Sequence, residues 1–92
     1  MAHIVAIHEV EDPERFWGAA GSIDLPEGVA ILSTYPRADG TRAVCLWEAD
    51  SADSVREIVE GAAGDISHNE FFEVDPGHPA TTGLPVSSAA RA

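Results

Sequence analysis

Residues 43–49, Ala43-Val-Cys-Leu-Trp-Glu-Ala49, decide the fold of this chain. An extended segment places alternate side chains on opposite faces. One face here carries Ala, Cys and Trp, and the other carries Val, Leu and a single Glu, so both faces are largely apolar. A strand with one exposed face alternates apolar with polar residues, and this segment does not. The pattern therefore predicts a strand that is covered on both faces and lies in the middle of a sheet.

The composition restricts the class of protein. A chain of 92 residues suffices for one domain with a modest core. Hydrophobic residues make up 45% of it, which is typical of a globular protein. The net charge is -11, and the basic residues are arginines without a single lysine. Phosphate contacts need clustered basic residues, so nucleic acid and anionic membranes are not expected partners.

Cysteine usage and hydropathy bear on the compartment. Cys45 is the single cysteine, which excludes a disulfide framework within the chain. No apolar run approaches the roughly 20 residues of a membrane-spanning helix, and the chain starts without a basic and then apolar leader. We expect a cytoplasmic protein with no membrane partner.

The first third of the chain predicts a strand and a helix. Residues 3–10 are apolar on both faces, like 43–49, and predict a second central strand. Asp12 is a good N-cap, and Pro13 suits the first helical position. A helix of about ten residues is expected to end at Gly21, because glycine favours helix termination.

The rest of the chain continues the alternation of elements. In chain order we expect a strand at 29–35, a tight hairpin turn at Asp39-Gly40, a helix that starts at Asp50 or Ser51 and ends between Gly61 and Gly64, and a strand at 66–74. The composition then changes, and residues 76–92 lack any hydrophobic period. The predicted domain therefore covers residues 1–75, and 76–92 form a flexible C-terminal tail.

The order of these elements is βαββαβ, which is the ferredoxin-like arrangement of the α+β class. Right-handed crossovers give a four-stranded antiparallel sheet in the order 4-1-3-2, with two helices on one face. The other face carries apolar residues such as Val5 and Ile7, which two helices on the opposite side cannot cover. We expect a homodimer in which the sheet faces of two copies pack together.

Two segments, Val5-Ala-Ile-His8 and Cys45-Leu-Trp-Glu-Ala-Asp-Ser51, match a known pattern. By these segments and the order of its elements, the chain resembles the dimeric α+β barrel superfamily, and within it small uncharacterised or nickel-binding bacterial proteins. The histidines that those relatives often carry in the second helix are absent from residues 55–64. The resemblance implies a pocket between helices and sheet. It also implies either binding of a metal or small molecule, or the chemistry of cofactor-free monooxygenases and cyclases.

Two histidines are candidate metal ligands. The predicted topology places His8 beside residues 67–69, so His8 and His68 can meet if they share a face. Two imidazoles and a carboxylate suit a divalent transition metal such as Ni, Zn or Cu. The alternative is that His8 is a hydrogen-bonded core residue and His68 is solvated. No organic cofactor is expected.

Other side chains are candidates for a ligand pocket or for catalysis. Glu48 ends a buried strand, where a raised pKa would suit a general base; alternatively it caps the next helix or pairs with an arginine. The expected pocket residues are His8, Trp17, Tyr35 and Trp47, although aromatic residues are more often simply core. Cys45 is interpreted as an inert buried thiol.

Three functions are compatible with these observations. The first is a small dimeric binding protein that holds a divalent metal ion or a small apolar ligand near His8. The second is a cofactor-free monooxygenase or cyclase of specialised, polyketide-like metabolism, with His8 or Glu48 as catalytic candidates. The third is a structural or regulatory dimer without a ligand. The acidic surface and the histidines favour the first.

Overall fold

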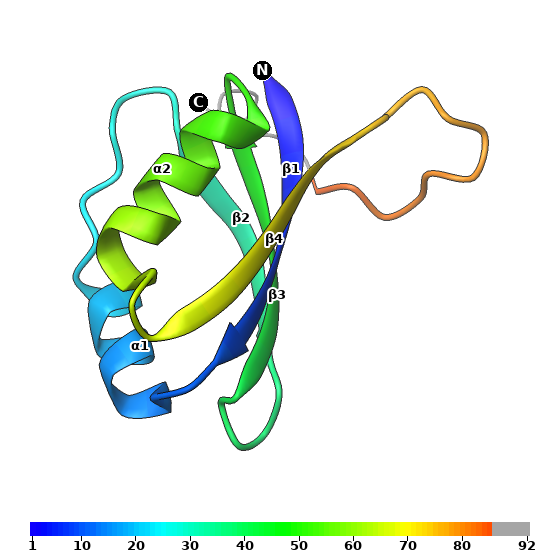
Figure 1. Ribbon diagram of the computed structural model, residues 1–92. Coiled ribbons are helices and arrows are strands. Elements are labelled where there is room, and N and C mark those ends of the chain that lie inside the picture. Colours follow the sequence, from blue (N-terminus) through cyan, green and yellow to red (C-terminus); the bar gives the residue numbers. More distant parts are fainter. Residues whose placement is uncertain (86–92) are drawn as a thin grey trace.

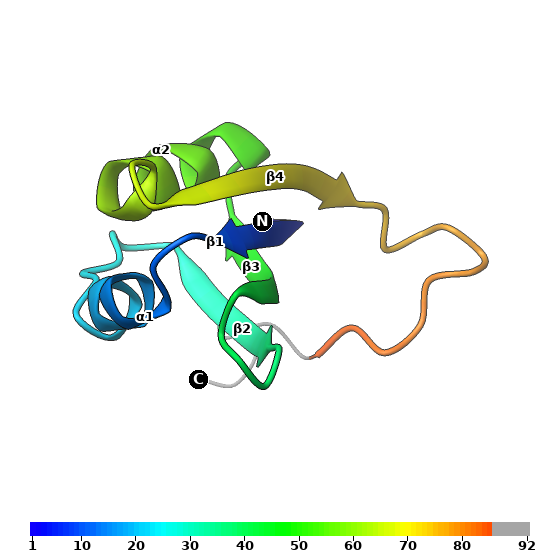
Figure 2. The same ribbon diagram turned by 60° about the horizontal axis from the view of Figure 1, so that its bottom comes forward.

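The computed structural model describes residues 1–85 (Figure 1). Its elements are β1 (Ala2–Val10), α1 (Pro13–Gly21), β2 (Ala30–Pro36), β3 (Arg42–Ala49), α2 (Ala52–Ala63) and β4 (Ser67–Val74). The strands form a single sheet in the order β2-β3-β1-β4, and all neighbours are antiparallel. Both helices lie on one face of this sheet (Figures 1 and 2). The predicted ferredoxin-like fold and strand order are confirmed.

Local sequence signals set the helix starts. The carboxylate of Asp12 accepts a hydrogen bond from the backbone N–H of Arg15 at 3.2 Å, and Pro13 occupies the first helical turn. The start of α2 had two candidate caps, and Ser51 is the residue that acts, since its hydroxyl accepts from the N–H of Ser54 at 3.2 Å. Each cap satisfies an N–H that the helix itself leaves unpaired.

The hairpin between β2 and β3 forms at the predicted Asp-Gly turn. Gly40 has a φ of 74°, which a residue with a side chain rarely adopts. The carboxylate of Asp39 accepts from the N–H of Thr41 at 2.9 Å, and Arg37 lies beside it. The hydrogen bond from Arg37 holds the pKa of Asp39 well below its usual range. A Cβ at Gly40 would lie 3.1 Å from Nε1 of Trp17, so this glycine also lets α1 approach the turn.

The two central strands bury their helix-facing residues. Ile4, Ala6 and His8 of β1 are at most 2% exposed, and Ala43, Cys45 and Trp47 of β3 are at most 6% exposed. Val55 and Val59 of α2 pack in one cluster with Ile4 and Trp47. Phe16 of α1 belongs to a second cluster, with Val10, Ala63 and Ile66. The core therefore lies between the sheet and the helices.

The opposite face of the sheet, which we call the open face, is only partly covered. It carries Val44, Tyr35 and Phe72, which are 39%, 68% and 48% exposed. Within residues 1–85 no helix lies on this side, so cover of 43–49 on both faces depends on the expected second copy, which stays a prediction. Residues 80–85 return toward the open face and border a hollow with Val5, Val44 and Leu46.

The last strand ends just before the predicted domain boundary at residue 75, which itself stays a prediction. β4 ends at Val74, and residues 75–85 form turns and extended chain with no helix or strand. The rest of the predicted tail, 86–92, lies outside the described residues. Within residues 1–85, no helix is long and apolar enough to cross a membrane.

Candidate functional site

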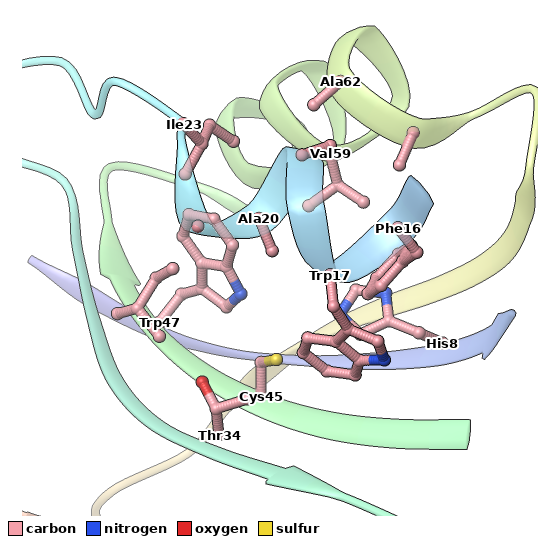
Figure 3. Close-up of a pocket in the computed structure, with 14 residues that line it drawn as sticks. His8, Phe16, Trp17, Ala20, Ile23, Thr34, Cys45, Trp47, Val59 and Ala62 are labelled. Carbon is pink, nitrogen blue, oxygen red and sulfur yellow. The ribbon is translucent and has the colours of Figure 1, made fainter. Parts of the chain in front are cut away.

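A cavity of about 280 Å³ lies between the two helices and the sheet (Figure 3). We call it the helix–sheet cavity. Its walls come from α1, β2, β3 and α2, with His8 from β1. The lining residues are His8, Phe16, Trp17, Ala19, Ala20, Gly21, Ile23, Ile31, Thr34, Cys45, Trp47, Val59, Ala62 and Ala63. Small residues on both helices leave this space open, and the wall is mainly apolar.

His8 reaches the cavity from the centre of the sheet. Its side chain is 2% exposed, and its ring centroid lies 5.3 Å from that of Phe16. Nδ1 lies 2.6 Å from Oδ1 of Asn69, which is its direct cross-strand partner on β4. Burial lowers the pKa of His8 below its ordinary value; the Asn69 hydrogen bond and the charge of Glu60 oppose this shift. His8 is therefore neutral at neutral pH.

Asn69 is held in turn by a second hydrogen bond. Its Nδ2 donates to Oγ of Ser67 at 3.0 Å. The Ser67 hydroxyl donates to the backbone carbonyl of Ala63, at the end of α2, at 2.6 Å. A chain of hydrogen bonds thus runs from the last turn of α2 through β4 to the imidazole of His8.

Two tryptophans line the cavity and differ in the state of their indole N–H. Nε1 of Trp17 donates to the backbone carbonyl of Gly40 at 3.0 Å, which fixes the ring against the hairpin. Trp47 is 3% exposed, and its Nε1 is buried without a hydrogen-bond partner in residues 1–85. Figure 3 shows this nitrogen pointing into the cavity, toward the side where Cys45 and Trp17 lie. The predictions for both tryptophans as pocket residues agree with these positions.

Cys45 lies on the floor of the same cavity. Burial raises the pKa of its thiol, and a hydrogen bond with the Thr34 side chain partly offsets the effect. A thiol with a raised pKa stays protonated, and the thiolate is the reactive form. The position agrees with the interpretation of Cys45 as an inert buried residue.

The structure does not bring His8 and His68 together. His8 pairs with Asn69 and faces the helices, whereas the next residue, His68, pairs with Glu9 and faces the opposite side. Successive strand residues point to opposite faces, so the two imidazoles are separated by the sheet. Within residues 1–85, no group of three His, Cys, Asp or Glu side chains is placed to hold a metal ion. The condition for the predicted metal pair, a shared face, is not met.

Tyr35 also lies outside the cavity. It pairs with Val44 on the open face and is 68% exposed. Strict alternation along β2 would place Tyr35 on the same face as Ile31, which does line the cavity. The register shifts between Ile31 and Ser33, and such a bulge reverses which residues point to each face. Tyr35 is therefore separated from His8, contrary to the prediction.

Glu48 is buried but does not line the cavity. It is 3% exposed, and its register partners are His3 and Ala30, on the side of β3 opposite to Trp47. Ser51, and not Glu48, is the N-cap of α2. The Glu48 carboxylate lies on the open face and cannot reach a ligand in the helix–sheet cavity. This position does not favour Glu48 as a general base for such a ligand.

The structure adds residues to the site that the sequence pattern did not predict. Asn69 was expected near His8, but its role as the hydrogen-bond partner was not foreseen. The paired alanines Ala19-Ala20 and Ala62-Ala63 line the cavity, and small residues on two facing helices are a sequence signal for open space. Comparisons of the chain with protein-family models, with curated proteins and with solved structures found no match.

Proposed function

We propose that this protein is a small dimeric binding protein that takes up a small, largely apolar molecule in the helix–sheet cavity. The observation that carries the proposal is the cavity itself. It is lined mainly by aromatic, aliphatic and small residues, with His8 at one end. Ligand sites in proteins are typically concave and apolar, with a few polar groups that orient the ligand.

The size of the cavity limits the ligand. An engineered apolar cavity of about 150 Å³ holds one benzene molecule. The helix–sheet cavity measures about 280 Å³ and thus suits a molecule of one or two rings. Because His8 is neutral, the cavity favours an uncharged ligand. A protonated, positively charged His8 would instead attract an anion.

The metal alternative has less support than the apolar ligand. The open-face position of His68 removes the second imidazole from the site, and His8 uses Nδ1 to bind Asn69. A single imidazole nitrogen among apolar groups is a weak donor set for Ni, Zn or Cu. Titration calorimetry with each metal tests this directly, and binding that disappears in His8→Phe would restore the metal hypothesis.

Naphthalene is a suitable probe for the apolar cavity, with binding measured by equilibrium dialysis. Ala20 points into the cavity in Figure 3, so Ala20→Phe fills the space from its exposed rim. The matched control is Ala38→Phe, which adds the same ring to the exposed hairpin. We expect binding to the wild type and the control and at least a tenfold loss in Ala20→Phe. Equal binding by both variants would place the probe elsewhere and refute the proposal.

A cofactor-free enzyme is the second candidate, in line with the expected monooxygenase or cyclase. The observation that favours it is a neutral, desolvated imidazole with a lowered pKa in an apolar cavity. In such an enzyme His8 would take a proton from a carbon next to a carbonyl, and the electron pair would move into an enolate. 2-Tetralone in D₂O tests this step, because return of a deuteron labels the ketone. A labelling rate unchanged in His8→Phe would eliminate His8 as the base.

The dimer belongs to the same proposal. Exposed Val44 and Phe72, together with Val5 and Leu46, give the open face an apolar surface that a second copy can cover. A cytoplasmic location also stays a prediction, which fractionation of cells that produce the protein would test.

A further inference from the structure

The hydrogen-bond chain behind His8 determines which nitrogen of the imidazole carries the proton. The Ser67 hydroxyl has one proton, and it is used toward the carbonyl of Ala63. Ser67 can therefore only accept from Asn69, so the amide nitrogen of Asn69 faces Ser67 and its oxygen faces His8. An amide oxygen is an acceptor, and Nδ1 of His8 must donate to it.

The second ring nitrogen is left as an acceptor. A neutral imidazole with a proton on Nδ1 has a lone pair on Nε2. No side chain or backbone group of residues 1–85 engages this atom. Figure 3 shows the His8 ring at one end of the cavity, beside Phe16 and Trp17, and Trp47 at the other end. The unpartnered N–H of Trp47 is a donor. The cavity therefore offers a hydrogen-bond acceptor at the His8 end and a hydrogen-bond donor at the Trp47 end.

We infer that the helix–sheet cavity selects an aromatic molecule with a hydroxyl group at the His8 end and an acceptor oxygen at the Trp47 end. The hydroxyl donates to Nε2 of His8, and the oxygen accepts from Nε1 of Trp47. Asn69 and Ser67 act as positioning residues that hold His8 in the required tautomer. This inference rests on the proposed function, since it needs the cavity to bind a ligand at all.

Charge around His8 is consistent with an acceptor role. Glu60 of α2 acts on the imidazole through its charge, and Cys45 of β3 lines the same cavity as a protonated thiol. The neighbours from α1 and β4 are Phe16 and Asn69, which do not titrate. Burial outweighs the carboxylate and lowers the pKa of His8, so Nε2 keeps its lone pair at neutral pH.

Three matched probes separate the selection from simple apolar binding. Naphthalene has no polar group, 2-methoxynaphthalene adds an acceptor oxygen, and 6-methoxy-2-naphthol adds a hydroxyl at the opposite end of the ring system. A net hydrogen bond stabilises by about 1 kcal/mol, which corresponds to roughly fivefold in affinity. At pH 7.5 we expect each step of the series to tighten binding by about this factor, measured by equilibrium dialysis. In His8→Phe the second step should vanish while the first remains.

Failure of each idea has its own signature. Absence of binding for all three probes would refute the proposed function. Binding of naphthalene and 6-methoxy-2-naphthol with equal affinity would leave the apolar site intact and refute the selection. Because His8→Phe leaves the amide of Asn69 without its partner, the double variant His8→Phe/Asn69→Leu is measured beside it; a hydroxyl preference that persists in both would exclude His8 as the acceptor.

The tautomer can be observed without any ligand. Long-range ¹H–¹⁵N spectra of the histidine rings distinguish a protonated nitrogen from one with a lone pair. We expect His8 to show the proton on Nδ1 in the wild type and a mixture of tautomers in Asn69→Leu. A proton found on Nε2 in the wild type would overturn the inference, whatever the probes bind.

Discussion

The two faces of the sheet are built from the same strands, yet their side chains differ in burial. On β1, Ile4 is fully buried under the helices, whereas Ile7 points to the open face and is partly exposed. On β3, Cys45 is 6% exposed and its neighbour Val44 is 39% exposed. Composition alone does not distinguish such neighbours. What covers each face, and not how apolar the residues are, decides how much they stabilise the fold.

The largest effect is expected from truncation of the helix-facing side. Ile4→Ala removes a fully buried side chain and should lower the free energy of unfolding by about 3 kcal/mol. Ile7→Ala, the matched control on the same strand, should cost about 1 kcal/mol at low protein concentration, because its side chain is partly exposed. Urea denaturation of both variants measures the difference.

The same pair reports on the open face. If a second copy covers it, the cost of Ile7→Ala should increase with protein concentration, whereas that of Ile4→Ala should not. Equal costs for both variants at every concentration would show that the two faces do not differ as described.

The next effect concerns the proposed dimer. Val44→Glu places a charge on the open face, beside Ile7 of β1 and Tyr35 of β2, and burial of an unpaired charge costs several kcal/mol. We expect the dimer to dissociate at least 100-fold more readily, as measured by size-exclusion chromatography with light scattering. Glu57→Ala on exposed α2 is the control and should leave the mass unchanged. A wild type that is monomeric at all concentrations would contradict the dimer.

A smaller effect is expected from pH, and it belongs to the helix side. Burial lowers the pKa of His8 in the folded state below 6.5, its ordinary value. The unfolded chain then binds more protons than the folded chain as pH falls below 6.5, so stability is lost in that window. The loss is at most about 1.4 kcal/mol for each pH unit until the folded-state pKa is reached.

Comparison with His8→Phe isolates this contribution. Denaturation between pH 7.5 and 5.5 should show a steeper decline for the wild type than for the variant, since other titrating groups affect both chains equally. Identical slopes for the wild type and His8→Phe would contradict the buried neutral state.

The sequence predicted the fold well, because two segments that are apolar on both faces, 3–10 and 43–49, identified the central strands. It also placed His8 beside residues 67–69, since antiparallel topology fixes which strand ends meet. It did not resolve which of these residues share a face with His8. A change of one residue in register moves every side chain to the other side, and only the observed pairing settles this.

The resemblance implied a pocket, but its volume was a second feature that hydrophobic periodicity could not predict. Its volume depends on how closely the helices approach the sheet and on the alanines that face it, and periodicity measures neither. The face of Tyr35 was missed for a local reason. A bulge in β2 interrupts the alternation that the prediction assumed, and the sequence 29–35 contains no glycine that would signal it.

The smallest effect on stability is expected around that bulge, because side chains before and after it in β2 point to opposite faces from those that strict alternation gives. Ile31 lines the helix–sheet cavity and Tyr35 lies on the open face, 68% exposed. Tyr35→Ala should cost the single chain at most about 0.5 kcal/mol, as is usual for exposed positions, and leave the affinity for naphthalene unchanged. Ile31→Ala removes part of the cavity wall and should weaken naphthalene binding severalfold at a similarly small cost in stability. If Tyr35→Ala were instead the variant that lost binding, the ligand would lie on the open face, and the assignment of the two faces would be reversed.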